Sequence, residues 1–172
     1  MSKQADIRFE KATDAAGVRS ANERAFEGSV EADIVDALRR DCPDLVSLVA
    51  DDHGVVGHIL FSPAVVESGD WRVAGMGLAP LAVVPERQGG IGSALVERGL
   101  AELRERGCPF VVVLGHPGYY PRFGFEPASS RGMVCQWEGI PEEAFMVLVM
   151  DEVAMDGVSG VARYRHEFDA AV

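Results

Sequence analysis

Two apolar strand patterns separated by one helical pattern lie in the middle of the sequence, and this order constrains the fold most. Residues 76–84 are almost entirely apolar, residues 91–106 repeat apolar side chains at helical spacing, and residues 110–114 (FVVVL) are a continuous apolar run. A strand, a helix and a strand in this order predict a parallel pair joined by a right-handed crossover. Pro80 cannot donate to a ladder, so it predicts a bulge or a splayed strand.

The flanking sequence predicts a mixed sheet. Further helices are predicted over residues 14–26 and 31–40, and further strands over residues 7–10, 45–50, 55–61 and 146–150. Thr13 is the predicted cap of the first helix. The strands on either side of the Asp-Asp-His-Gly turn at residues 51–54 predict an antiparallel hairpin. We therefore expect one α/β domain over residues 1–172, with antiparallel N-terminal strands, a parallel central pair and flanking helices.

Composition narrows the classes of function. The chain has 172 residues and no run of eighteen apolar residues, and its N-terminus lacks the apolar stretch of a signal peptide, so we expect a cytoplasmic protein without a membrane partner. The formal net charge of −11 repels nucleic acid. The only lysines are Lys3 and Lys11, which leaves no candidate downstream for a Schiff-base or phosphate-loop lysine. The three cysteines lack a metal-binding spacing, and we expect no metal.

A glycine-rich turn, PERQGGIG at residues 85–92, lies between the first central strand and the helix. Backbone N–H groups at a helix N-terminus favour an anion such as phosphate, and Gly89, Gly90 and Gly92 let the backbone approach it closely. The alternative is a tight connection with no ligand. No Lys-Ser/Thr follows the glycines, as a nucleoside-triphosphate loop requires, and Leu95 occupies the third glycine position of a dinucleotide fingerprint.

Two motifs in this order resemble those of the GNAT superfamily of N-acetyltransferases. Residues 87–92 (RQGGIG) resemble its coenzyme A loop, Arg/Gln-x-x-Gly-x-Gly/Ala, and either Arg87 or Gln88 fills the first position. Residues 114–128 (LGHPGYYPRFGFEPA) resemble the segment in which a tyrosine, here Tyr120, lies four residues before a Gly-Phe pair. The GHPxYYPRFGF version, together with VVGHILFSP at residues 55–63, is similar to a YhbS-like bacterial subgroup.

The resemblance implies a GNAT-like sheet whose fourth and fifth strands splay apart around acetyl-coenzyme A. By this resemblance, Leu81, Ala82 and Val83 pair with the pantetheine amides. The pyrophosphate is expected on the turn, formed by Arg87, Gln88, Gly89, Gly90, Ile91, Gly92 and Ser93. The implied reaction is direct attack of a primary amine on the thioester, with a strand N–H near Val83 facing the oxyanion.

The resemblance makes Tyr120 the general acid for the departing thiolate; the alternative is an aromatic side chain that packs on Phe123 and Phe125. Tyr119 is assigned to packing. The general base is left open among His116, a carboxylate and a water relay, the carboxylate candidates being Glu31, Asp33 and Glu86. His58 lies in an apolar strand and is interpreted as a hydrogen-bonded core histidine.

The acceptor amine is a small molecule or a peptide, and the acidic chain favours a cationic one. Two other classes stay open: a coenzyme A-binding module that has lost the chemistry, and a partner-binding module with no cofactor. A homodimer is a common state of such enzymes, and the residues after Asp156 either complete a sheet edge or form a dimer contact.

Overall fold

The computed structural model describes residues 4–172, which form two compact units. The first unit holds residues 4–61, Ala79–Ala101 and Glu167–Ala171, and the second holds Ser62–Leu78, Glu102–His166 and Val172. Three elements pass from one unit into the other: β3 (Val55–Ser68), β4 (Trp71–Val83) and α3 (Ile91–Glu105). That residues 1–172 form one domain stays a prediction.

The first unit is built on antiparallel strands in the order β1-β2-β3. β1 (Asp6–Phe9) pairs with β2 (Val46–Asp51), which pairs with the first half of β3. The register shifts between Ala50 and Asp51, just before the turn into β3. The predicted hairpin is therefore confirmed, and β3 continues seven residues beyond its predicted end at Phe61.

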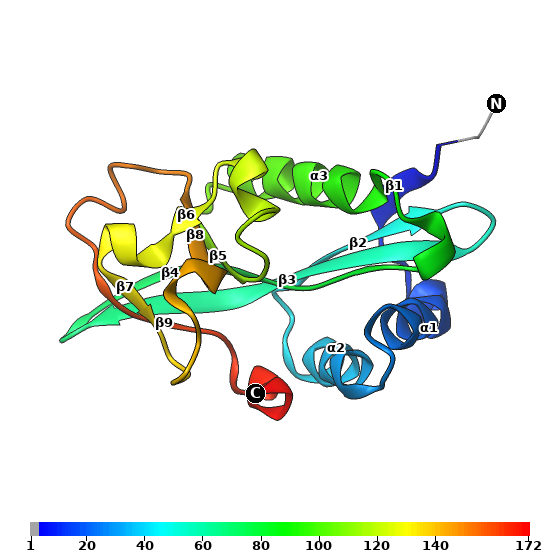
Figure 1. Cartoon of the computed structure of the whole chain (residues 1–172), viewed down its shortest axis with the longest axis horizontal. Helices are drawn as coiled ribbons and strands as arrows, with labels where there is room; N and C mark the ends of the chain where they lie inside the picture. Colours follow the sequence, from blue (N-terminus) through cyan, green and yellow to red (C-terminus); the bar gives the residue numbers. More distant parts are fainter. Residues whose placement is uncertain (1–3) are drawn as a thin grey trace. The chain divides into compact units, whose positions relative to one another are not determined.

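Helices cover both faces of these strands (Figure 1). On β3, Gly57 lies against α3, whereas the next residue, His58, contacts Asn22 of α1 (Ala15–Phe26). Successive residues of a strand point to opposite faces, so α1 and α3 lie on opposite sides of β3. α2 (Val30–Asp41) packs beside α1 and buries Ile34, Val35 and Leu38.

The approach of α3 to β3 is close because glycines lie at two contact points. A Cβ on Gly57 would lie 3.0 Å from Cγ2 of Ile91 and 3.1 Å from Cδ1 of Leu95. A Cβ on Gly99 would lie 2.3 Å from the ring of Phe61. The side chains of Leu95 and Phe61 are fully buried here, which fixes the position of the helix along the strand.

The second unit holds the parallel pair. β4 pairs in parallel with β5 (Phe110–Leu114), and β5 pairs antiparallel with β8 (Phe145–Val149), which also pairs with β6 (Glu126–Pro127). The β4–β5 ladder runs from Met76↔Val111 to Leu78↔Val113 and ends two residues before Pro80. The predicted mixed sheet with a parallel central pair is confirmed.

Two strands near the end of the chain were not predicted. β9 (Gly160–Arg163) pairs antiparallel with β3 and parallel with β7 (Met133–Cys135). The residues after Asp156 therefore complete a sheet edge, the first of the two predicted alternatives. These strands have four and three residues, too few for a periodic pattern to appear in the sequence.

The predicted cap of the first helix is wrong. Thr13 lies inside a 3-10 turn (Ala12–Asp14) that leads into α1, and it does not precede the helix directly. The carboxylate of Asp14 instead accepts the backbone N–H of Lys11 at 2.7 Å and binds Arg8 at 2.7 Å. The hydrogen bond from Arg8 lowers the pKa of Asp14 to about 2, so Asp14 is ionised at neutral pH and its carboxylate holds the turn to Lys11.

Tyr164 follows β9 and joins the two central strands of the second unit. Its hydroxyl lies 3.1 Å from the carbonyl oxygen of Val112 on β5 and 3.3 Å from that of Leu78 on β4. Its ring stacks on Trp137 and lies where a Cβ on Gly77 would approach to 2.4 Å. Burial raises the pKa of Tyr164, so the phenol keeps its proton for these carbonyls.

We expect Tyr164→Phe to destabilise the chain by about 1 to 3 kcal/mol, because buried acceptors lose a donor that water cannot replace. Urea unfolding followed by circular dichroism measures the change. Tyr119→Phe removes the phenol oxygen from a half-buried ring, and it should lower the free energy of unfolding by less than Tyr164→Phe does. An equal or smaller loss for Tyr164→Phe would contradict the assigned role.

Candidate functional site

The glycine turn exposes its backbone at the N-terminus of α3. A 3-10 turn, η2 (Pro85–Arg87), follows β4, and α3 begins at Ile91. Gly89 has φ +130° and Gly90 has φ +100°, conformations that other residues rarely adopt, and a Cβ at either position would meet no atom within 4 Å. An open backbone at the positive end of a fifteen-residue helix can receive an anionic group.

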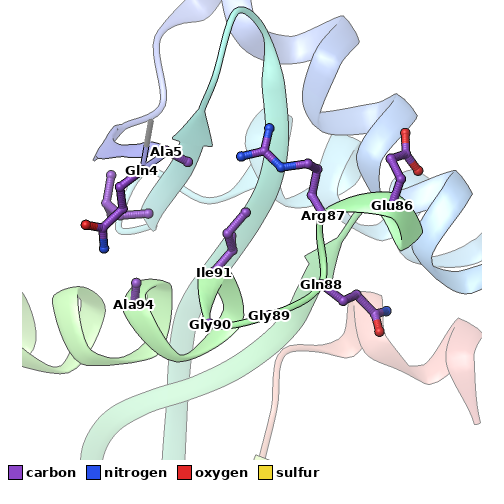
Figure 2. A pocket seen from close by; sticks show the side chains of 10 residues that line it. Gln4, Ala5, Glu86, Arg87, Gln88, Gly89, Gly90, Ile91 and Ala94 are labelled. Atoms are coloured by element: carbon purple, nitrogen blue, oxygen red, sulfur yellow. The ribbon is translucent and has the colours of Figure 1, made fainter. Parts of the chain in front are cut away.

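A half-open hollow of about 470 Å³ lies at this turn (Figure 2). Arg87, Gln88, Gly89, Gly90 and Ile91, all predicted site residues, line it together with residues at the start of the chain, among them Gln4 and Ala5. Nothing in the sequence indicates this second wall, because residues 4–5 carry no motif and about eighty positions separate them from the turn.

The remaining predicted coenzyme-binding residues lie in the first unit, before and after the turn along the chain. Leu81, Ala82 and Val83 form the end of β4, and Ala82 is buried. Gly92 and Ser93 lie in the first turn of α3.

Ion pairs fix the side chains next to the glycines. Glu86 binds Arg24 of α1, and this contact lowers the pKa of the Glu86 carboxyl. Arg87 binds Asp52 in the turn between β2 and β3. Figure 2 shows the side chains of Arg87 and Gln88 leaving the turn in opposite directions. The pairing commits the Arg87 guanidinium to a carboxylate of the chain itself.

Tyr120 lies in the second unit, at the start of η3 (Tyr120–Phe123). Its side chain is 8% exposed, and its ring packs edge-on against Tyr119 and Phe125, with centroids 5.1 and 5.7 Å away. The ring also lies where a Cβ on Gly115 would approach to 2.4 Å. Burial raises the pKa of Tyr120, with a smaller contribution from Tyr119, so the phenol is protonated at neutral pH.

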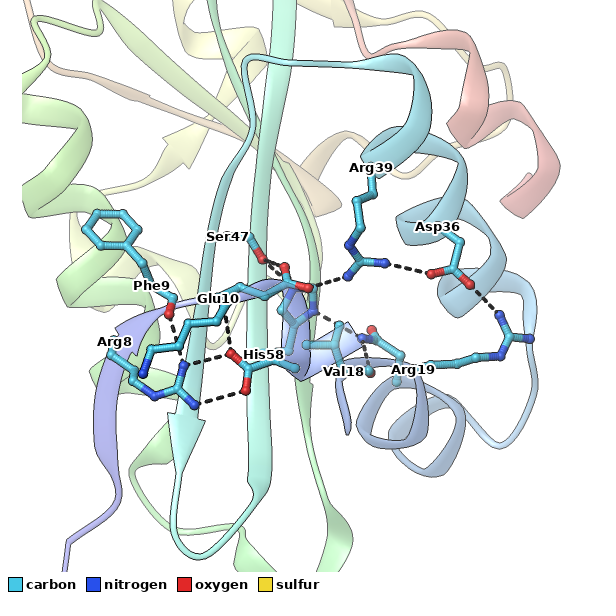
Figure 3. Close-up of polar contacts among 12 residues, drawn as sticks. Arg8, Phe9, Glu10, Val18, Arg19, Asp36, Arg39, Ser47 and His58 are labelled. Atoms are coloured by element: carbon cyan, nitrogen blue, oxygen red, sulfur yellow. Dashed lines mark hydrogen bonds and ion pairs between the residues drawn. The ribbon is translucent and has the colours of Figure 1, made fainter. Parts of the chain in front are cut away.

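The histidine predicted to belong to the core is confirmed there. His58 is fully buried, with Nδ1 3.1 Å from the amide nitrogen of Asn22 and Nε2 2.9 Å from the hydroxyl of Ser47 (Figure 3). Ser47 in turn donates to Glu10, which also accepts from Arg39. Burial lowers the pKa of His58 to about 3, so it is neutral and makes structural hydrogen bonds.

The other candidates for the general base differ in their exposure and in their ion-pair partners. His116 is exposed in the loop after β5. Glu86 and Asp33 form ion pairs with Arg24 and Arg19, and Glu31 lies on α2. Among residues 4–172 no group of three or more His, Cys, Asp or Glu side chains could hold a metal ion. No helix in the same range is long and apolar enough to span a bilayer.

Known proteins resemble this chain over most of its length. The family described as "Acetyltransferase (GNAT) domain" matches residues 6–128. The chain is 42% identical over 166 residues to the uncharacterized N-acetyltransferase YhbS of Escherichia coli K12, covering 95% of this chain and 98% of the relative. It is 45% identical over 136 residues to the uncharacterized N-acetyltransferase YjhQ of the same strain, covering 76% and 75%.

Solved structures agree with this relationship. The crystal structure of Escherichia coli YhbS in complex with CoA has a TM-score of 0.88 and 39% identity, covering 98% of this chain and 94% of that one. A GNAT family acetyltransferase from Brucella melitensis in complex with acetyl-CoA has a TM-score of 0.78 and 37% identity, covering 95% and 97%. Because both sequence motifs, the mixed sheet and these relatives agree, the chain belongs to the GNAT family of acetyltransferases.

Proposed function

We propose that the chain binds acetyl-coenzyme A at the glycine turn and transfers its acetyl group to a primary amine. The observation that carries the proposal is the open backbone of Gly89 and Gly90 at the N-terminus of α3, beside a hollow of about 470 Å³. No side chain covers the backbone at these two glycines, so a pyrophosphate can approach its N–H groups closely. Relatives with 39% and 37% identity bind CoA and acetyl-CoA, which supports the same ligand here.

The proposal assigns a task to each part of the chain. Backbone N–H groups of residues 88–93 bind the pyrophosphate, and Leu81, Ala82 and Val83 bind the pantetheine amides through their backbone. An N–H near Val83 faces the carbonyl oxygen, on which negative charge develops when the amine attacks. The C–N bond forms, the C–S bond breaks, the amine loses a proton to a base or water, and Tyr120 gives its proton to the thiolate.

The packing of Tyr120 has two opposite effects on this assignment. Burial keeps the phenol protonated, as an acid must be before it acts. The same burial disfavours phenolate and makes Tyr120 a weaker acid, so the transfer requires the thiolate to be held close. The ring contacts with Phe123 and Phe125 favour the second candidate function, a coenzyme A-binding module in which Tyr120 only packs.

The acceptor is proposed to be a cationic amine, because the chain carries a formal net charge of −11. A polyamine, an aminoglycoside and a peptide N-terminus represent the classes to be tested.

Acetyl-coenzyme A at about 100 times its Kd should stabilise the chain by about 2.7 kcal/mol and raise Tm by several degrees, whereas ATP and NAD should not. Gly90→Ala should reduce this shift, because a Cβ at φ +100° strains the cradle. Gly139→Ala is the matched control, since Gly139 also has a positive φ, +76°, and open space around it. Equal shifts in both variants would place the ligand elsewhere.

Tyr120→Phe should lower kcat by about 100-fold with any amine that the chain accepts, and should leave the Kd for coenzyme A within about twofold. Release of the coenzyme A thiol measures the rate, and calorimetry measures Kd. Tyr119→Phe is the matched control, and its kcat should stay close to that of the unsubstituted chain. An unchanged kcat in Tyr120→Phe would remove the acid role, and no turnover with any amine would favour the binding module.

A further inference from the structure

The turn before the glycines is held by two ion pairs of opposite polarity. Glu86 accepts a hydrogen bond from Arg24 of α1, and Arg87 donates one to Asp52 between β2 and β3. Figure 2 shows these adjacent side chains leaving the turn in different directions. Two elements far apart in the sequence therefore hold consecutive residues of the same turn.

The glycines themselves have no side chain with which to pack. Gly89 and Gly90 have open space where a Cβ would lie, so their position depends on the residues at either end. On the helix side, Ile91 and Leu95 pack against Gly57 of β3. On the strand side, Val84 is buried, and the ion pairs are formed by exposed Glu86 and half-buried Arg87. Apolar packing thus anchors one end of the segment, and charge the other.

Asp52 can hold Arg87 in place because the turn between β2 and β3, to which Asp52 belongs, is itself held by hydrogen bonds and an ion pair. The carboxylate of the preceding residue, Asp51, accepts the N–H of Gly54 at 3.0 Å and binds Arg8 of β1 at 2.9 Å. The backbone N–H of Asp52 donates to the carbonyl of Gly54 at 2.9 Å. Arg87 is therefore attached to a turn that hydrogen bonds and an ion pair already hold.

The Asp52–Arg87 pair is the better shielded of the two. The side chains of Arg87 and Asp52 are 29% and 21% exposed, against 47% and 57% for Arg24 and Glu86. Exposed pairs contribute little because water and salt screen them, and partly buried pairs are screened less. The larger effect on the turn should therefore come from Asp52.

We propose that Asp52 is a positioning residue which, through Arg87, holds Gly89 and Gly90 in the conformation that binds the phosphates of coenzyme A. The inference rests on the proposed coenzyme A site. Ordering the segment before the ligand arrives removes part of the entropy that binding would otherwise lose. Arg87 then acts as a tether of the turn, and the phosphates are bound by backbone N–H groups.

Replacing Asp52 by Asn tests whether Arg87 tethers the turn or binds the phosphates itself, because the two roles change the Kd for coenzyme A in opposite directions. If Arg87 were a phosphate ligand that Asp52 restrains, Asp52→Asn would free a cation, remove a negative charge and tighten coenzyme A binding. If Asp52 positions the turn, the same change releases the tether and weakens binding. We expect a rise in Kd of about five- to tenfold, measured by calorimetry at fixed ionic strength.

Two further variants complete the test. Asp44→Asn removes the same charge from an exposed residue before β2 and should leave Kd unchanged. Asp52→Arg combined with Arg87→Asp restores an ion pair of reversed polarity and should recover most of the lost affinity. A tighter or unchanged Kd in Asp52→Asn, or a reversed pair that binds as weakly as Asp52→Asn, would overturn the inference.

Amide hydrogen exchange keeps this test separate from that of the coenzyme A site. In the ligand-free chain, Asp52→Asn should speed exchange at residues 88–90, with no change at β5, which lies in the other unit. If the unsubstituted chain failed to bind coenzyme A, the proposed function would fall, and the exchange result alone would decide whether Asp52 orders the turn. Unchanged exchange at residues 88–90 would refute the tether.

Discussion

The packing of α3 on β3 is the constraint on which the site in the first unit depends. Gly57 and Gly99 let the helix approach the strand so closely that a methyl group on Gly99 would collide with Phe61, and one on Gly57 would crowd Ile91 and Leu95. Burying Leu95 contributes about 1.5 to 3 kcal/mol and fixes the helix along the strand. Since α3 begins at Ile91, the same contacts fix the end of the helix to which the glycine turn is attached.

A backbone that must receive a ligand cannot be covered by its own side chains. Gly89 and Gly90 meet this requirement, and they leave the turn without packing of its own. The chain compensates at both ends, with apolar contacts from Ile91 and ion pairs from Glu86 and Arg87. The backbone of Gly89 and Gly90 is therefore accessible to a ligand, while the contacts of Glu86, Arg87 and Ile91 keep the turn ordered.

Two tyrosines of the second unit show that membership of the family does not by itself assign a role to each side chain. Tyr120 belongs to a sequence motif of the family, yet its aromatic contacts support packing as well as acid chemistry. Tyr164 belongs to no motif that the sequence revealed, yet its hydroxyl bonds the carbonyls of both central strands. Membership of the family gives the fold and the class of reaction, and the role of each side chain depends on its own contacts.

Elements whose signals are local can be predicted from the amino-acid sequence alone. The helical spacing over residues 91–106, the apolar run of β5, the hairpin of β2 and β3 and the glycine turn all follow from neighbouring residues, and the two motifs identify the family. Local signals failed at Thr13, where a tertiary bond from Asp14 to Arg8 closes the entry into α1. Three features depend on the folded chain: β9 pairs with β3 and β7, the Tyr164 hydroxyl contacts the carbonyls of Leu78 and Val112, and Asp52 forms an ion pair with Arg87. These partners are 27 to 98 residues apart, so no periodicity or spacing along the chain encodes their contact.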